Sequence, residues 1–265
     1  MFQPGKLHID FYDDRRDIVI PGDAQETLTF CAKQFLDIGN GAIKEKGTFH
    51  VALSGGSTPK ALFQLLASPA YNQQIPWEKV VLFWSDERNV PPTSPESNYK
   101  MAMDAGFSSL PIPEANIHRM PAEGADITEA AKQYEILILQ LIPKGAFDLV
   151  MLGMGEDGHT ASLFPKTHGL HTENSLVCAN FIPQLNTWRM TLSYECINAA
   201  RHISIYVIGK NKASMVKHIL TSPPDFDELP IQKIGTRMHK AMWILDSAAA
   251  SQLVAALNTK EYFLS

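Results

Sequence analysis

The sequence predicts an α/β fold: a Rossmann-like, mostly parallel open sheet with helices on both faces. Three observations predict it. Short apolar runs alternate with helical patterns along the chain, which is typical of repeated βαβ units. The apolar runs are continuous, as in strands that are buried on both faces. A glycine-rich turn at residues 153–158 follows one such run, where an open α/β sheet places its ligand site.

The predicted elements follow one another in the order of such a fold. The apolar runs predict buried strands at residues 49–53, 80–84, 147–152, 203–208 and 242–245. The intervening patterns predict helices at residues 24–36, 59–66, 127–141, 212–220 and 248–257. Prolines make residues 91–95 a loop, and residues 168–192 form shorter alternating segments that predict a small antiparallel strand extension.

Length and charge limit the class of protein. The 265 residues, of which 45% are hydrophobic, suffice for a large core, and no linker or low-complexity block divides them. We therefore expect a single domain over residues 1–265. The net charge of −5 argues against a nucleic-acid partner. It leaves room for an anionic metabolite, because a few Lys and Arg side chains in a cleft outweigh a mildly negative average.

Cysteine usage and the absence of apolar spans predict the compartment. Cys31, Cys178 and Cys196 are odd in number and lack CxxC spacing, so we expect reduced packing thiols. The first residues show no signal-peptide core, and no apolar run approaches the length of a membrane span. The expectation is a cytoplasmic protein without a membrane partner. The sequence does not determine the oligomeric state, and a monomer is the simplest expectation.

Residues 53–59 (LSGGSTP) join a predicted strand to a predicted helix that we expect to begin at Pro59. The turn offers free N–H groups at Gly55 and Gly56, the hydroxyls of Ser57 and Thr58, and a positive helix end. Together these groups form an anion site. A capped helix without a ligand explains the same residues equally well.

The turn at residues 153–159 (GMGEDGH) places a carboxylate beside an imidazole. Asp157 lies two residues before His159, so it can orient the ring and raise its basicity. The alternative is a tight βα turn with a helix-capping Asp and an incidental surface His.

Longer strings point to a family. Residues 153–165 (GMGEDGHTASLFP), 53–59 and 85–91 (SDERNVP), continuing to 97–99, resemble the signatures of the 6-phosphogluconolactonases. Weaker matches follow at residues 189–193 and 209–213, all in the family's order. These enzymes are similar in fold to the glucosamine-6-phosphate deaminases. The resemblance implies hydrolysis of 6-phospho-D-glucono-1,5-lactone to 6-phospho-D-gluconate in the oxidative pentose phosphate pathway.

The resemblance also implies roles for single residues. By this resemblance, residues 55–58 form a binding site for the phosphate of a sugar phosphate, and Lys212 matches the lysine that reaches the same phosphate. Arg88 and Arg189 are candidates for the phosphate or sugar oxygens, because a guanidinium suits bidentate oxygen recognition. A structural salt bridge of Arg88 with Asp86 or Glu87 is the alternative.

His159 is the predicted general base on water, oriented by Asp157, with Asp86 as the next candidate. In the deaminases the residue matching Asp86 is implied to be the base, and a Glu five residues past the shared histidine supports ring opening. Here that position is Phe164, which cannot transfer a proton. This favours a lactonase over an amino-sugar phosphate deaminase or isomerase. The second rival is a sugar-phosphate-binding regulator without catalysis.

Neither a metal nor an organic cofactor is expected. His168 and His171 approach ligand spacing, but no Cys or carboxylate cluster accompanies them in the motifs. Residues 153–158 superficially match a GxGxxG dinucleotide fingerprint. However, Asp157 would lie near the pyrophosphate, and no acidic residue ends a second strand at the expected distance.

Overall fold

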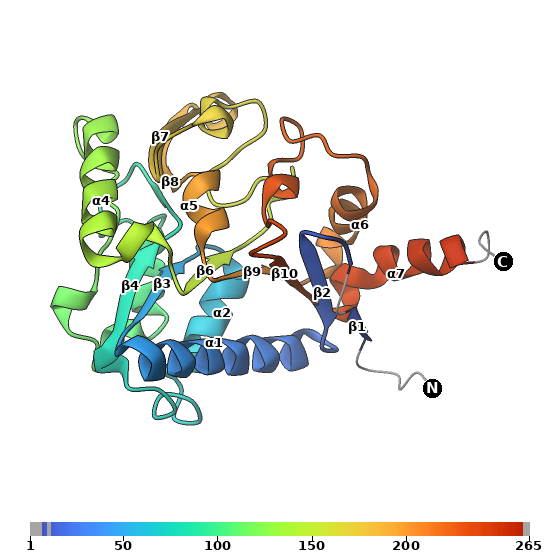
Figure 1. The fold of residues 1–265 in the computed structure, drawn as a ribbon, viewed down its shortest axis with the longest axis horizontal. Coiled ribbons are helices and arrows are strands. Elements are labelled where there is room, and N and C mark those ends of the chain that lie inside the picture. The colour runs from blue at the N-terminus through green and yellow to red at the C-terminus, as the bar shows by residue number, and fades with distance from the viewer. Residues whose placement is uncertain (1–6, 10–11, 262–265) are drawn as a thin grey trace.

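The computed structural model describes residues 7–9 and 12–261, which form two sheets with helices around them (Figure 1). The large sheet has the strand order β1-β2-β10-β9-β6-β3-β4. Only β1 runs antiparallel to its neighbour in this sheet, while the other described neighbours are parallel. Its strands are β1 (Leu7–Ile9), β2 (Arg16–Ile20), β3 (Phe49–Leu53), β4 (Val80–Trp84), β6 (Leu149–Leu152), β9 (His202–Val207) and β10 (Ala241–Leu245).

The small sheet is antiparallel and has the order β5-β8-β7. Its strands are β5 (Asp86–Arg88), β7 (Val177–Ile182) and β8 (Thr187–Leu192). This sheet confirms the strand extension predicted within residues 168–192. In Figure 1, α1 and α2 lie on one side of the large sheet, and α5 and the small sheet lie on the other.

The helices begin and end at residues whose side chains favour these positions. The Asp23 carboxylate and the Glu26 side chain form a capping box at the start of α1, and Gly47 ends that helix with φ of 88°. Asp126 caps α4 by accepting hydrogen bonds from the N–H groups of Thr128 and Glu129. The described helices are α1 (Ala24–Lys46), α2 (Ser57–Ala67), α3 (Asn98–Asp104), α4 (Ile127–Leu141), α5 (Tyr194–Ala199), α6 (Ala213–Thr221) and α7 (Ser247–Glu261).

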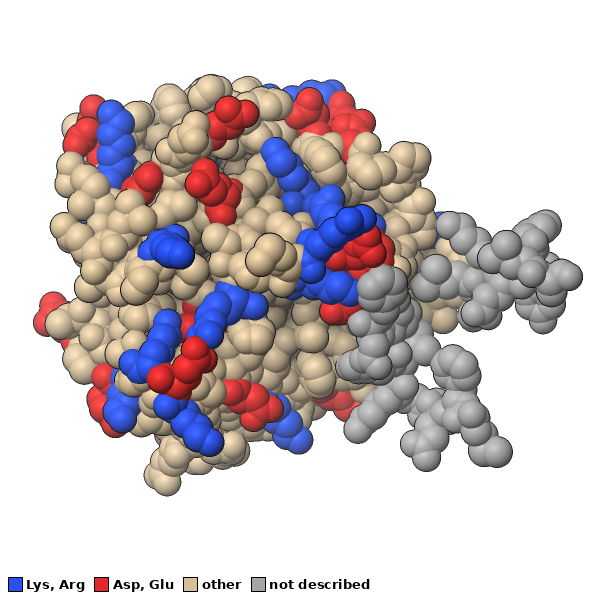
Figure 2. All heavy atoms as spheres, viewed as in Figure 1, with Lys and Arg blue, Asp and Glu red and all other residues tan. Residues whose placement is uncertain are grey.

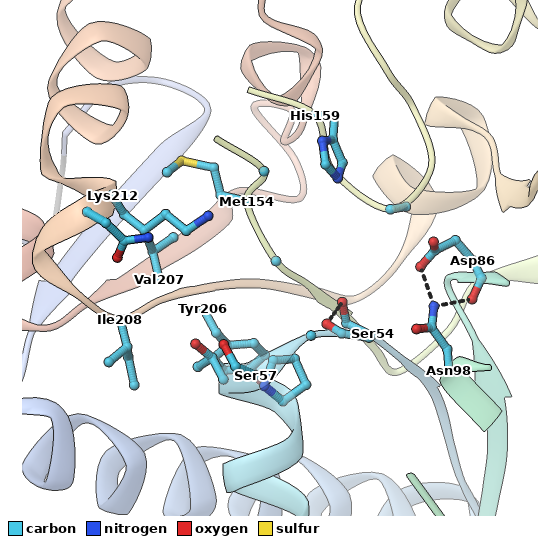
Figure 3. Close-up of a pocket in the computed structure, with 18 of the residues that line it drawn as sticks. Ser54, Ser57, Asp86, Asn98, Met154, His159, Tyr206, Val207, Ile208 and Lys212 are labelled. Carbon is cyan, nitrogen blue, oxygen red and sulfur yellow. Dashed lines mark hydrogen bonds between the residues drawn. The ribbon is translucent and has the colours of Figure 1, made fainter. Parts of the chain in front are cut away.

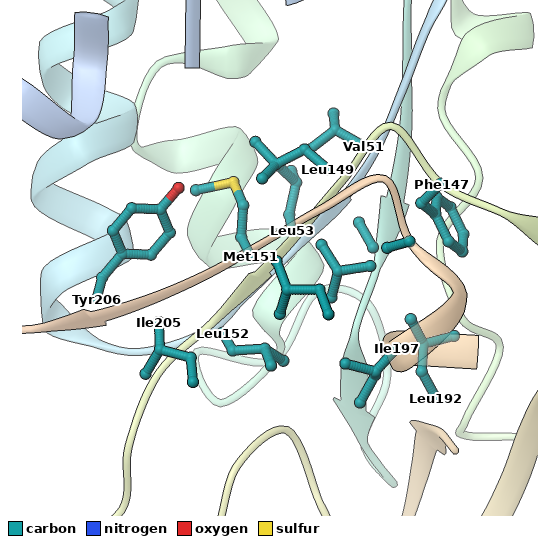
Figure 4. Close-up of a cluster of buried hydrophobic side chains, with 14 of the residues drawn as sticks. Val51, Leu53, Phe147, Leu149, Met151, Leu152, Leu192, Ile197, Ile205 and Tyr206 are labelled. Carbon is teal, nitrogen blue, oxygen red and sulfur yellow. The ribbon is translucent and has the colours of Figure 1, made fainter. Parts of the chain in front are cut away.

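The hydrophobic core joins the two sheets. Strands β3, β4 and β6 are buried along their whole length, as their continuous apolar sequences predict. Figure 4 shows side chains of β3, β6 and β9 clustered near Leu192 of β8 and Ile197 of α5. This packing fixes the small sheet against the carboxyl half of the large sheet, where the loops carry the predicted site.

The parallel sheet and the helices on both sides confirm the predicted fold class. Several predicted boundaries were wrong, those of helices α1, α2 and α6 among them. Helix α1 continues to Lys46, ten residues beyond the predicted end, and α2 begins at Ser57, so that Pro59 is its third residue. Helix α6 begins at Ala213, because residues 210–212 form a 3-10 turn. Strands β1 and β2 were missed, since charged residues precede the short apolar run 18–20.

Asp86 and Glu87 follow the predicted strand 80–84 and begin a separate strand that the sequence did not predict. Strand β4 ends at Trp84, and Ser85 leads into β5, which pairs with β8 of the other sheet. The hydroxyl of buried Ser85 donates to the Leu53 carbonyl oxygen, so the chain stays attached to β3 as it changes sheets. This change of sheet turns Asp86 and Arg88 toward the carboxyl ends of the central strands.

Charged groups close the opposite, amino-terminal edge of the sheet. Asp148 is 1% exposed, lies 2.9 Å from the ammonium of Lys46, and accepts a hydrogen bond from the His50 N–H. Arg201 lies 3.7 Å from the same carboxylate and forms a bidentate pair with Glu45. These contacts connect α1, β3, β6 and the loop before β9. Among the described helices, none is long and apolar enough to span a bilayer.

Candidate active site

A cavity of about 240 Å³ opens at the carboxyl ends of β3, β4, β6 and β9, which are neighbours in the large sheet (Figure 3). The loop after each strand contributes to its wall, as expected for an open α/β sheet. Eight of the ten predicted site residues line it: Gly55, Gly56, Ser57, Thr58, Asp86, Arg88, His159 and Lys212. Asp157 and Arg189 are not in the lining.

The loop after β3 forms one wall. Gly56 precedes α2 with φ of 103°, a left-handed conformation that favours glycine, and no side chain caps the helix. The first N–H groups of α2, at Ser57 and Thr58, have no partner within the helix. A Cβ at Gly55 would lie only 2.0 Å from the Asn98 Oδ1 atom. The loop therefore combines a free positive helix end with close packing against α3.

Lys212 faces this helix end from the loop after β9. In Figure 3 its ammonium points into the cavity. The neighbouring Asn211 donates a hydrogen bond of 3.0 Å to the Glu156 Oε1 atom, which joins this turn to the loop after β6. The helix end and the ammonium both favour an anion in the space between them.

His159 comes from the loop after β6. Its Nδ1 atom lies 2.5 Å from Oδ1 of Asp157, which also accepts the His159 backbone N–H at 3.1 Å. Partial burial raises the pKa of Asp157, but the hydrogen bond from His159 outweighs it, so the pKa lies below its ordinary value. An ionised Asp157 accepts the Nδ1 proton. Neutral His159 then carries its free lone pair on Nε2.

Asp86 is buried at the back of the cavity and is 6% exposed. Its Oδ2 atom accepts a hydrogen bond of 2.7 Å from the Ser162 hydroxyl, and its Oδ1 atom accepts one of 3.2 Å from the Asn98 amide (Figure 3). Both carboxylate oxygens thus have donors from the protein. The arrangement links β5, α3 and the loop that follows His159.

Arg88 and Arg189 are directly opposite each other in the register of β5 and β8. Arg88 donates through Nη1 to the Glu96 carbonyl oxygen, and among the described residues it has no ion pair with Asp86 or Glu87, which argues against the salt-bridge alternative. The Nε atom of Arg189 is buried without a hydrogen-bond partner, and burial together with the charge of Arg88 lowers the pKa of Arg189. Two adjacent guanidinium groups favour a nearby anion.

Sequence reasoning missed the polar residues that hold this site in place. Asn98 and Ser162 lie within the quoted motifs, but their partner Asp86 is distant in sequence. Buried Glu87 accepts hydrogen bonds from the Ser97 hydroxyl and from the N–H groups of residues 88, 98 and 99. Desolvation raises the pKa of Glu87 against these hydrogen bonds.

The pattern of the glucosamine-6-phosphate isomerases/6-phosphogluconolactonases matches residues 22–243, most of the chain. The chain belongs to this family. A 6-phosphogluconolactonase of Chlamydia pneumoniae is 39% identical over 235 residues, which is 88% of this chain and 89% of the relative. One from Haemophilus influenzae is 41% identical over 204 residues, 77% of this chain and 87% of the relative.

Solved structures of family members share the fold described above. The 6-phosphogluconolactonase from Trypanosoma cruzi has a TM-score of 0.78 and 27% identity, covering 91% of this chain and 98% of the other. The family match spans all four loops that form the cavity. Within the described residues, no group of three or more His, Cys, Asp or Glu side chains is arranged to hold a metal ion.

Proposed function

We propose that this family member hydrolyses 6-phospho-D-glucono-1,5-lactone to 6-phospho-D-gluconate, the lactonase step of the oxidative pentose phosphate pathway. One observation carries the proposal. An imidazole, oriented by Asp157 through Nδ1, lines the same cavity as the free end of α2 and the Lys212 ammonium. An oriented base beside an anion site suits acyl transfer on a phosphorylated substrate. The names of the relatives support the same reaction.

In this reaction water attacks C1 of the lactone and His159 Nε2 takes the proton from that water. The tetrahedral intermediate then collapses as the bond between C1 and the ring oxygen breaks. The imidazolium returns the proton to the departing ring oxygen, so the enzyme ends in its starting state. Asp157 stabilises the imidazolium during the cycle. No net oxidation occurs, and we propose that no cofactor takes part.

The phosphate of the substrate fixes the ring for this attack. We assign it to Gly55, Gly56, Ser57 and Thr58 of the loop, together with the ammonium of Lys212. Arg88 lines the cavity and also suits an oxyanion, and Arg189 reinforces the positive potential beside it. Holding the substrate in this way converts the attack of water into an oriented, nearly unimolecular step.

Asp86 is better suited to positioning than to proton abstraction. Ser162 and Asn98 donate to its two oxygens, and it is buried. Both oxygens of this carboxylate are thus already engaged by donors from the protein, which suits a group that fixes the surrounding loops. We therefore propose His159 as the base and Asp86 as a group that fixes the loops around it.

The amino-sugar deaminase is the weaker alternative. At the position where the deaminases carry the Glu that supports ring opening, this chain has Phe164, whose ring stacks on His159 at 3.9 Å. An aromatic ring supplies no proton there. A regulator that only binds sugar phosphates does not explain the oriented imidazole.

The test compares turnover with binding in His159→Ala. We expect kcat for the lactone to fall by about 10²- to 10⁴-fold, the usual contribution of a positioned base. Affinity for 6-phosphogluconate, measured by calorimetry, stays near the wild-type value because the phosphate contacts remain. An unchanged kcat would contradict the assignment of His159, and Asp86→Asn would then be the next variant to measure.

We further propose that residues 1–265 act as one domain in the cytoplasm and that the working unit is a monomer. All three cysteines are free thiols in the structure, which supports a reducing compartment. On the face shown in Figure 2, Lys and Arg are interspersed with Asp and Glu. This pattern supports a small anionic substrate over a nucleic acid.

A further inference from the structure

We propose that Phe164 is a positioning residue that holds the His159 imidazole in a slot, with only Nε2 directed at the substrate. The proposal rests on His159 being the base. Phe164 is a partly exposed aromatic residue, and in the described part of the chain it does not belong to the hydrophobic core. Its ring lies parallel to the imidazole, with centroids 3.9 Å apart and planes 18° apart.

Gly155 forms a second side of the slot. A Cβ atom at this position would lie 2.1 Å from His159 Nδ1 and 2.3 Å from Cε1. The imidazole thus occupies the space that any side chain at residue 155 would take. The Gly155 N–H also donates to the His159 carbonyl oxygen at 2.8 Å, which ties the two residues together through the backbone.

Asp157 closes the third side by accepting the Nδ1 proton at 2.5 Å. Each of these contacts restricts a different motion. The carboxylate sets the tautomer and the rotation about χ2, while Gly155 and Phe164 limit the sideways movement of the ring. Of the two ring nitrogens of His159, Nε2 has no hydrogen-bond partner among the described residues, and His159 lines the cavity.

The chain between the two rings is built to bring them together. Leu163 donates its N–H to the Thr160 carbonyl oxygen at 2.9 Å, which closes a tight turn, and the Thr160 hydroxyl donates to the Gly153 carbonyl oxygen at 2.8 Å. Ala161 within this turn has φ of 48°, a left-handed conformation that is unfavourable for alanine. The turn reverses the chain so that Phe164 returns over His159.

The slot is expected to support catalysis by holding the His159 imidazole in one orientation. A displacement of about 1 Å in a reacting group can cost about 100-fold in rate. The aromatic face also excludes water from one side of the base. We therefore expect Phe164→Leu, which removes the flat face but keeps an apolar side chain, to lower kcat by roughly 10- to 100-fold. KM stays unchanged because Phe164 is not part of the cavity lining.

Two matched variants separate positioning from general packing. Phe164→Tyr retains the stacked face and restores wild-type kcat. Phe226→Leu makes the same change at another partly exposed phenylalanine and leaves kcat unaltered. If Phe164→Leu fails to fold, Gly155→Ala tests the slot from the other side, since its methyl would displace the imidazole while Phe164 remains. Full kcat in either slot variant, Phe164→Leu or Gly155→Ala, would overturn the proposal.

A spectroscopic measurement tests the stack without turnover. In wild-type protein, the ring current of Phe164 shifts the His159 carbon-bound ring protons upfield in the NMR spectrum. We expect this shift to vanish in Phe164→Leu and persist in Phe164→Tyr; identical resonances in all three proteins would refute the slot. The parent assignment is tested separately: loss of kcat in His159→Ala with full kcat in Phe164→Leu rejects only the slot, whereas full kcat in His159→Ala rejects the base itself.

Discussion

Because Gly55 has no side chain, the Asn98 amide can pack directly against it in the candidate site. It packs against the amide of Asn98, which in turn holds the Asp86 carboxylate and the Asp86 carbonyl oxygen. The loop after β3 and the carboxylate are thereby fixed relative to each other through a single amide. The sequence showed the glycine and the asparagine in separate motifs, but their contact depends on how the loops after β3 and β4 meet.

Gly55→Ala is therefore expected to displace Asn98 and to lower kcat/KM by about tenfold or more, because small misplacements near the reacting centre are costly. The effect is measured by steady-state kinetics on the lactone. Gly41→Ala is the matched control, since no atom lies within 4 Å of a Cβ built at that helical position. Equal kinetics for the two variants would show that the contact with Asn98 has no catalytic importance.

The Arg88 and Arg189 pair is a second feature at the residue scale. Their side chains repel each other across β5 and β8, and the Arg189 Nε atom has no hydrogen-bond partner. We expect Arg189→Met to weaken binding of 6-phosphogluconate by about tenfold, or roughly 1.4 kcal/mol, since it removes a positive charge beside the anion site. The same variant raises the thermal midpoint, because it removes a half-buried cation whose Nε atom has no hydrogen-bond partner. Weaker stability with unchanged affinity would assign Arg189 a purely structural role.

At the scale of elements, Asp148 connects α1, β3 and the loop before β9 at the amino-terminal edge of the large sheet. Burial raises the pKa of Asp148, but hydrogen bonds from His50 and Lys46 outweigh this and hold it below the ordinary value. Because the folded-state pKa is depressed, this stabilisation is present above the unfolded pKa and is lost as the pH falls through the folded value. The contacts explain why α1 must continue to Lys46, which amphipathic patterning did not indicate.

Removal of the buried Asp148 carboxylate should destabilise the protein more than removal of an exposed carboxylate. We expect Asp148→Ala to lower the free energy of unfolding by about 3–5 kcal/mol, the usual cost of leaving buried partners uncompensated. Glu45→Ala, which breaks an exposed pair with Arg201, should have a much smaller effect on the free energy of unfolding, because solvent screens exposed ion pairs. Urea denaturation measures both, and a cost for Asp148→Ala as small as that of the control would contradict this account.

The elements differ in how well the sequence predicts them. Strands β3 and β4 and helix α4 were predicted with their observed bounds, because burial on both faces or a clear amphipathic pattern acts locally. Strand β5 was not separated from β4, since only pairing with β8 distinguishes it. The candidate catalytic motif was found because its residues are contiguous. The partners of Asp86 were not found, because two separate segments, the start of α3 and the loop after His159, supply them.

At the scale of the molecule, acid is expected to destabilise the fold. Burial, with a smaller effect from the charge of His50, lowers the pKa of His118, which packs on the Phe83 ring at 4.8 Å. A depressed histidine pKa means that the unfolded chain takes up the proton first. Stability therefore falls as the pH drops below about 6.5, the unfolded value. His118→Gln should reduce the slope of unfolding free energy against pH below about pH 6.5.

The control for this measurement is the exposed residue His168, for which His168→Gln should leave the slope as in the wild type. Urea denaturation at several pH values provides the comparison. A steeper or unchanged slope in His118→Gln would show that its imidazole is as readily protonated in the folded as in the unfolded chain.

For the whole protein, we propose a catalyst in which the oriented His159 acts as the base in hydrolysis of a phosphorylated lactone. The most direct measurement is the loss of freshly generated 6-phosphogluconolactone near neutral pH, followed with and without the protein. The lactone also hydrolyses spontaneously, so the rate must be compared with that background. The account predicts a clear acceleration that rises in proportion to protein concentration. A folded preparation that leaves the spontaneous rate unchanged would contradict it.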